Sequence, residues 1–346
     1  MRWACLLGLI LLSSCQGEKP TVDLGFYHWK TSFDLPQEER LYMDSLGASR
    51  LYLRFFDLDW DAQRQEVIPL AMLEQKARPP KDWQVVPTIF ITNRCMLQMA
   101  DEQLPALADR MHRKITDLWR KLELTQPLQE WQLDCDWTEQ SRARYFELLE
   151  LLGAKFGPTV TRSATIRLHQ VKYFQKTGVP PVDRGMLMCY NVGELGQWET
   201  ENSILDPDIL KAYLVNFDRY PLTLDLVLPL FRWGILFRDE RMIRLINGLH
   251  TAQLQDTSRF EVLGPHRHLV RQGTFLEGHY LYKGDQIRLE KTDLALLQQV
   301  SQILQPHWPS NDYLLCFYHL DRELLPAFPA DSLLQVKDHL QSKIPE

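Results

Sequence analysis

The sequence predicts an α/β protein built as a parallel (β/α)8 TIM barrel, with a small antiparallel β insertion between strands seven and eight. Three observations predict this fold. Eight short apolar segments recur along the chain, helical patterns separate most of them, and no glycine-rich phosphate turn follows the first segment. Each parallel crossover needs a covering helix, so the alternation favours a closed barrel over a doubly wound open sheet.

The predicted strands are rich in β-branched and aromatic residues. They are 24–29, 50–58, 84–92, 131–137, 162–169, 185–190, 222–231 and 313–319. The predicted helices are 37–46, 104–122, 140–155, 206–217, 294–304 and 330–342. The segment at about 250–291 instead has glycine turns and alternating apolar residues, which indicates antiparallel hairpins. Because it follows a strand's carboxyl end, we expect it to form one wall of a cleft.

The first fifteen residues have the pattern of a secretory signal: Arg2, an apolar run over 4–12, and small residues before Cys15. Leu12-Ser13-Ser14-Cys15 also resembles the lipobox of bacterial lipoproteins, which favours lipidation of Cys15 over an ordinary signal peptide. The expected organisation is a signal peptide (1–14), a lipid-anchored linker (15–22) and the barrel domain (23–346). No other segment is apolar for long enough to cross a membrane.

Charge and cysteine spacing limit the classes of partner, metal and cofactor that the chain is expected to bind. The net charge is −6 and there is no long basic run, so we expect no nucleic-acid partner. Apart from Cys5 and Cys15, the cysteines lie in or beside apolar strands without metal-ligand spacing. We expect these four to be buried thiols, and we expect no metal and no cofactor; they are Cys95, Cys135, Cys189 and Cys316.

Alternation along the predicted strands sorts residues into inward and outward sets. The inward charged residues balance one another, and a fully paired ionic network would explain them structurally; they are Arg54, Asp134, Asp136 and Arg167. We favour that role for Arg54 and Asp134, the deeper pair. Position near the carboxyl mouth, where such barrels have their active sites, favours function for a second set: Asp136, Thr138, Arg167, His169 and Tyr190.

Two motifs resemble family-18 chitinases and related glycoside hydrolases, which carry Asp-x-Asp-x-Glu on strand four and Met-x-Tyr-Asp/Asn on strand six. This chain has Asp134-Cys-Asp136-Trp137-Thr138 and Met188-Cys-Tyr190-Asn191 there. The sequence around these two motifs is similar to that of lipoproteins from Bacteroidetes-type bacteria. The resemblance implies a glycan substrate, a glutamate that protonates the glycosidic oxygen, and an aspartate two residues earlier that orients the substrate.

The chain departs from the family at the decisive position. Asp136 matches the orienting aspartate, and Thr138 then occupies the place of the acid, although a threonine hydroxyl is no useful proton donor. The adjacent Glu139 either turns inward as a replacement acid or caps the following helix, and the capping role is favoured. Asp136 would itself be an acid if burial raised its pKa, but Arg167 opposes that shift. The catalytic candidates are Asp136, Glu139 and Tyr190.

Other residues near the mouth suit sugar recognition, because sugars stack on aromatic faces and their hydroxyls bind carboxylates and amides. The substrate-binding candidates are Asp134, Trp29, His28, Asp57, Asp59, Arg167, His169, Asn191 and Trp233. Two functions remain open. One is a membrane-anchored glycoside hydrolase-like barrel acting on an extracytoplasmic glycan. The other is a non-catalytic glycan- or protein-binding lipoprotein. Both place the chain in the bacterial envelope, anchored to the outer membrane by its N-terminal lipid.

Overall fold

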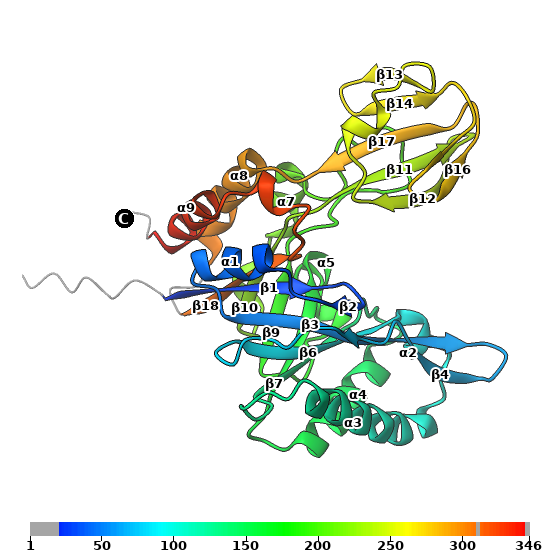
Figure 1. The fold of residues 1–346 in the computed structure, drawn as a ribbon. Helices are drawn as coiled ribbons and strands as arrows, with labels where there is room; N and C mark the ends of the chain where they lie inside the picture. The colour runs from blue at the N-terminus through cyan, green and yellow to red at the C-terminus, as the bar shows by residue number, and fades with distance from the viewer. Residues whose placement is uncertain (1–20, 309–311, 343–346) are drawn as a thin grey trace, which may run out of the picture.

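A closed ring of eight parallel strands forms the centre of the molecule (Figure 1). The structure, a computed structural model, describes residues 21–308 and 312–342. In ring order the strands are β1 (Val22–His28), β3 (Arg50–Asp61), β6 (Gln84–Ile91), β7 (Glu130–Asp134), β8 (Thr161–Arg167), β9 (Arg184–Met188), β10 (Leu224–Pro229) and β18 (Tyr313–Tyr318). β1 closes the ring by pairing with both β3 and β18. The predicted TIM barrel is confirmed.

Helices lie around the ring. They are α1 (Gln37–Ser45), α2 (Asn93–Gln98), α3 (Leu104–Lys121), α4 (Arg142–Phe156), α5 (Leu168–Lys172), α6 (Phe174–Thr177), α7 (Pro207–Tyr213), α8 (Leu294–Leu304) and α9 (Ala330–Gln341). Local chemistry sets several of their ends. Asp206 accepts hydrogen bonds from the first backbone N–H groups of α7, and Gly157, with φ of 84°, ends α4. Among the described residues, no helix is long and apolar enough to span a membrane.

The alternation inferred for strand four holds as far as the strand extends. Gln132 points inward, where it accepts a hydrogen bond from the Tyr27 hydroxyl at 2.7 Å and donates to Ser163 Oγ at 3.2 Å. Trp137 points outward and stacks on Tyr145 of α4, with ring centroids 5.2 Å apart. The four predicted thiols are also buried and free. Gln132 is therefore hydrogen-bonded inside the barrel, while Trp137 packs under a covering helix.

A β-bulge interrupts the alternation in β3. Arg54 pairs with Thr88 of β6, but the next pair is Phe56 with Ile89, so one residue is skipped. Asp57 then pairs with Phe90 and comes onto the same inward side as Arg54. Strict alternation would have separated Arg54 from Asp57, and the bulge instead makes them neighbours.

An antiparallel five-stranded sheet is inserted between β10 and β18, as predicted. Its order is β12 (Arg241–Asn247), β11 (Arg232–Arg238), β17 (Gln286–Lys291), β14 (Arg267–Val270) and β13 (Phe260–Gly264). A small hairpin, β15 (Thr274–Leu276) and β16 (His279–Leu281), accompanies it. The insertion begins at Arg232 rather than near 250, because β11 starts almost directly after β10. Asp239 and Glu240, both with positive φ, form the turn from β11 to β12.

The inserted sheet has a hydrophobic core of its own, separate from that of the barrel. This second core contains Leu236, Ile246, Leu249, Leu254, Phe260, Val270, Leu276, Leu281, Ile287 and Leu289. Figure 1 shows the insertion standing away from the helices α3 and α4. The predicted signal peptide and Cys15 lie outside the described residues.

Two short strand pairs complete the description of the fold. β4 (Glu66–Leu70) extends the barrel sheet beyond β3 as an antiparallel hairpin. β2 (Ser32–Phe33) pairs with β5 (Glu74–Gln75). Both lie in the connections that follow β1 and β3, on the side of the mouth.

Candidate functional site

A cavity of about 560 Å³ lies at the carboxyl end of the barrel strands. It is lined by Trp29, Lys30, Arg54, Phe90, Asp134, Asp136, Arg167, Tyr190, Asn191, Phe231, Arg232, Trp233, Asn247, Gly248, Tyr318, His319, Asp321, Glu323 and Leu324. Most of these residues end or follow a barrel strand, and four come from the inserted sheet and the turn after it. The cavity therefore lies where the barrel meets the insertion, with one wall from the insertion.

Two carboxyl groups of strand four line the cavity in different environments. Asp134 is buried and accepts a hydrogen bond from Thr165 Oγ1 at 2.6 Å. Burial, with repulsion from Asp136, raises the pKa of Asp134 to about 6. Asp136 is half-exposed, and Arg167 Nε donates to its Oδ1 at 2.6 Å. Two neighbouring acids thus differ in burial and partner, an arrangement typical of acid–base sites.

Arg167 is held between this carboxylate and an aromatic ring. Its second bond to Asp136, from Nη2 to Oδ2, is 3.3 Å long, and its Cζ atom lies 5.5 Å from the centroid of the Tyr190 ring. Burial opposes its charge, but the carboxylate of Asp136 outweighs burial and raises the pKa of Arg167. Arg167 therefore stays a cation and fixes the orientation of Asp136.

Thr138 and Glu139 lie outside the cavity. β7 ends at Asp134, and the chain turns before α4, so that the Thr138 amide donates to Ser141 Oγ at 2.9 Å. Both Thr138 and Glu139 are exposed on this turn, and Ser141 stands at the N-cap of α4. The expectation that Thr138 occupies the place of the acid is not supported, because the last cavity-lining residue of this strand face is Asp136.

Aromatic rings form much of the cavity wall. Tyr190 stacks on Tyr318 with ring centroids 5.2 Å apart, and Trp29 lies 5.6 Å from Tyr318. Phe231 contacts Tyr318 at 5.8 Å and Trp233 at 5.1 Å. These rings link the ends of several barrel strands into a continuous apolar surface. Such a surface, rimmed by charged groups, is suited to sugar rings and their hydroxyls.

The other predicted site residues are divided. Asn191, in the left-handed region at φ of 55°, lines the cavity beside Tyr190. Asp57 binds Arg54, whose Nε donates to Asp57 Oδ1 at 2.7 Å, so the partner of Arg54 is Asp57 rather than Asp134. This correction follows from the bulge in β3. Asp57 itself lies behind Arg54 and is not in direct contact with the cavity.

Three predicted binding residues lie away from the cavity. Asp59 accepts hydrogen bonds from Thr92 and Arg94. His28 points outward, since its neighbour Tyr27 points inward, and packs 5.1 Å from Phe33; burial lowers the pKa of His28 to about 4. His169 is exposed on α5, because β8 ends at Arg167 and the strand does not continue.

Several cavity residues were not predicted from the sequence. Tyr318 and His319 end strand eight, where position alone would have marked them. Burial lowers the pKa of His319 to about 4, so its ring is neutral at pH 7, and its Nδ1 has no hydrogen-bond partner among the described residues. Arg232, Asn247 and others reach the cavity from the insertion, which no local pattern indicates. The described residues include no group of three or more acidic, histidine or cysteine side chains placed to hold a metal ion.

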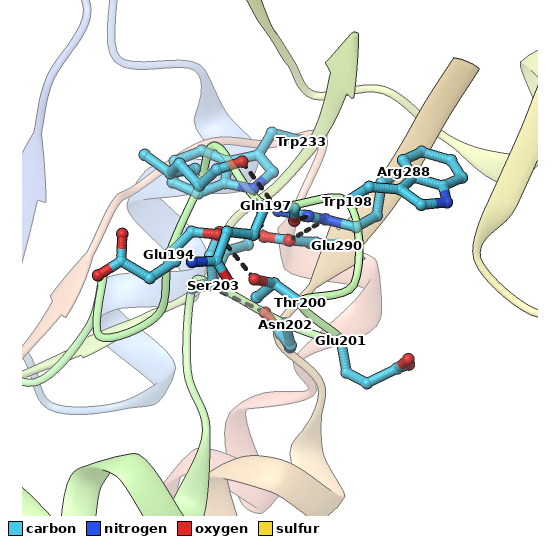
Figure 2. A network of polar contacts seen from close by, with 12 residues as sticks. Glu194, Gln197, Trp198, Thr200, Glu201, Asn202, Ser203, Trp233, Arg288 and Glu290 are labelled. Atoms are coloured by element: carbon cyan, nitrogen blue, oxygen red, sulfur yellow. Dashed lines mark hydrogen bonds and ion pairs between the residues drawn. The ribbon is translucent and has the colours of Figure 1, made fainter. Parts of the chain in front are cut away.

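A polar network lies behind the insertion wall, between the inserted sheet and the loop that follows β9 (Figure 2). The side chains of Arg288 and Glu290 are fully buried there and form an ion pair, with Arg288 Nε 2.7 Å from Glu290 Oε1. Glu290 Oε2 accepts a hydrogen bond from Trp233 Nε1 at 2.7 Å and one from Ser203 Oγ at 2.5 Å. The network thus connects the cavity wall to the loop.

The fold is similar to that of several solved structures. One is the spore cortex-lytic enzyme SleL of Bacillus cereus, with 12% identity and a TM-score of 0.54 over 95% of this chain and 77% of that chain. Its Bacillus megaterium counterpart has 12% identity and a TM-score of 0.52 over 93% and 75%. A chitinase from Chromobacterium violaceum has 9% identity and a TM-score of 0.52 over 93% and 100%. At these identities the likeness establishes a chitinase-like barrel fold. No protein-family model and no curated protein sequence matches this chain.

Proposed function

We propose that this protein is a glycoside hydrolase-like barrel that acts on a glycan bound in the cavity at its carboxyl mouth. The observation that carries the proposal is the pair Asp134 and Asp136, directed into an aromatic-walled cavity from the end of strand four. Glycoside hydrolysis uses two carboxyl groups in unlike environments, and aromatic walls bind sugar rings. The barrel fold shared with a chitinase and cortex-lytic enzymes supports the same class of substrate by analogy.

We infer that the strand-four motif is displaced by two residues from the match suggested by sequence. Gln132, Asp134 and Asp136 share the inward face, and they occupy the three positions of Asp-x-Asp-x-Glu. Asp136 then stands at the terminal, acid position and Asp134 behind it. Thr138 and Glu139 have no part in this arrangement, because both lie on the turn outside the cavity.

In the proposed mechanism, the proton for the glycosidic oxygen is stored on Asp134. Asp134, whose pKa is raised to about 6, holds that proton in the buried position next to Asp136. Asp136, which faces the bound glycan and is held by Arg167, relays this proton from Asp134 to the glycosidic oxygen. The glycosidic bond then breaks and the leaving sugar departs with the proton as its hydroxyl group. A water molecule adds to the anomeric carbon and returns one proton to the carboxyl pair. The Tyr190 ring, stacked on Tyr318, positions the sugar at the reacting centre.

The test is turnover of N-acetylated and plain glycans by the purified protein. Asp136→Asn is expected to lower kcat by on the order of a hundredfold, since it removes the proposed proton donor. Asp117→Asn, an exposed aspartate on α3, is the matched control and is expected to leave kcat unchanged. The hydrolase proposal fails if no substrate is turned over or if both variants keep full activity.

A second candidate function is glycan binding without catalysis. It is favoured by one observation: both oxygens of Asp136 already accept hydrogen bonds from Arg167. If this second function is correct, the purified protein used in the turnover test binds glycans and does not hydrolyse them. In that case Trp29→Ala, which removes an aromatic wall residue, is expected to weaken binding about fivefold in a titration, because stacking contributes on the order of 1 kcal/mol.

We also propose that the chain is a lipoprotein of a Bacteroidetes-type bacterial envelope, anchored to the outer membrane through Cys15. Support comes from the lipobox-like segment Leu12-Ser13-Ser14-Cys15. Metabolic labelling with a fatty acid is expected to label the wild-type protein and not Cys15→Ser, and fractionation is expected to find only the wild type in the outer membrane. Equal labelling of both proteins would contradict the anchor.

A further inference from the structure

The seam between the insertion and the loop after β9 is built around one buried ion pair. Arg288 and Glu290 lie on the same face of β17, two residues apart. Besides Glu290, Arg288 donates to two backbone carbonyls of the loop, Gln197 and, at 3.2 Å, Leu195. Asn202 of the same loop donates to the Lys291 carbonyl at 2.9 Å. The loop is therefore fastened to the sheet along its length, as Figure 2 shows.

Glu290 is placed directly opposite Trp233. The two residues are register partners in the antiparallel pair of β11 and β17, so their side chains lie on the same face of the sheet. The indole N–H is an obligatory donor when buried, and Glu290 accepts it at 2.7 Å. This bond fixes the rotation of the indole ring, which neighbouring Phe231 contacts at a centroid distance of 5.1 Å.

Both oxygens of Glu290 are engaged within the network. Oε1 faces Arg288, and Oε2 receives Trp233 and Ser203. Because Arg288 and Ser203 hold the carboxylate in place, the acceptor seen by the indole is fixed before any ligand arrives. A ring whose orientation is set in advance loses less conformational entropy when it binds a sugar.

We propose that Glu290 is a positioning residue: it holds the Trp233 indole as a rigid wall of the cavity, braced by Arg288 and Ser203. The use of that wall for glycan binding rests on the proposed function, while the positioning itself does not. If Glu290 served only to neutralise the buried charge of Arg288, stability of the fold would depend on the network, but the orientation of the Trp233 indole would not.

The test measures the indole directly, on protein labelled with 15N-tryptophan. Trp233→Phe identifies the Trp233 indole N–H signal by its disappearance. Ser203→Ala removes one of the two bonds to Oε2 and leaves the ion pair intact. Glu290→Gln replaces an acceptor oxygen by an amide group and is expected to move the Trp233 signal and to speed its hydrogen exchange, while signals of tryptophans outside the insertion stay in place.

Glu290→Gln leaves Arg288 without a charged partner, so a second variant guards against simple unfolding. The double variant Arg288→Met with Glu290→Leu has no uncompensated buried charge and no acceptor for the indole, and it is expected to fold with a displaced Trp233 signal. Arg271→Ala, which breaks an exposed pair with Glu261 in the same insertion, is the control and is expected to leave the signal unchanged. An unmoved Trp233 signal in folded Glu290 variants overturns the inference.

Measurements of glycan affinity distinguish a failure of this inference from a failure of the proposed function. For a glycan that binds the wild type, Glu290→Gln is expected to weaken binding or raise KM about tenfold, with kcat changed much less, because a hydrogen bond to a charged group is lost. Unchanged affinity for such a glycan overturns the use of Trp233 as a binding wall. If no glycan binds the wild type, the proposed function falls, and the indole signal still decides the positioning.

Discussion

Replacing Arg288 by alanine is expected to lower the free energy of unfolding by about 3–5 kcal/mol. The substitution leaves the carboxylate of Glu290, whose side chain is fully buried, without its cationic partner. It also removes the donors to the Leu195 and Gln197 carbonyls. Taking one member from a buried ion pair is far more damaging than taking both, because the remaining charge has no solvent around it.

The measurement is urea denaturation of the wild type and Arg288→Ala. Arg271→Ala is the matched control: the same change of residue type in the same insertion, at a pair whose two side chains are half exposed. Exposed pairs contribute on the order of 1 kcal/mol or less, so the control is expected to stay close to the wild type. Similar losses of free energy of unfolding in both variants would show that the buried ion pair contributes no more to stability than the exposed pair.

Asp134→Asn is expected to raise the free energy of unfolding by about 3 kcal/mol at pH 7 to 8. The pKa of Asp134 rises from 3.8 to about 6 on folding, chiefly because burial disfavours the carboxylate. Well below pH 4 the group is neutral in both states and carries no penalty. Between the unfolded pKa of 3.8 and the folded pKa of about 6 the unfolded chain ionises while the folded protein keeps the proton, so stability is lost over this window and the loss levels off above it. Asparagine remains neutral and accepts the Thr165 hydrogen bond through its amide oxygen.

The test is a series of denaturation curves from pH 4 to 8. The difference between Asp134→Asn and the wild type is expected to be small at pH 4 and to grow up to about pH 7. Asp117→Asn, at an exposed position, is the control and should give no such trend. A difference that does not vary with pH would rule out Asp134 as the titrating group. Functional sites contain groups that lower the stability of the fold, so the destabilising effect of Asp134 at neutral pH fits a functional role for this residue.

The barrel could be predicted because its evidence is local. Each strand is an apolar, β-rich run, and the covering helices have their own periodicity, so the order of elements follows from the text of the sequence. Gln132, Asp134 and Trp137 could be assigned to faces by alternation for the same reason. The insertion was predicted in place but not in extent, since β11 follows β10 so closely that their apolar runs merge.

Features that depend on pairing could not be predicted. The bulge in β3 arises from its register with β6, and no residue near Phe56 signals it. The end of β7 at Asp134 moved Thr138 and Glu139 out of the site, because an alternation rule assumes that the strand continues. The bond between Ser203 and Glu290 joins residues 87 positions apart, beyond the reach of any local pattern. The candidate site was therefore found in outline: Trp233 and a wall from the insertion were predicted, and the polar network that holds that wall was not.

The separate core of the inserted sheet has a consequence for mutational tolerance. Substitutions among Leu236, Ile246, Ile287 and their neighbours are expected to repack only that core and to leave the packing of the barrel unchanged. Two groups of residues in the insertion affect both parts at once. Trp233, Ile235 and Phe237 of β11 belong to the core of the barrel, and Arg288 and Glu290 hold the loop after β9.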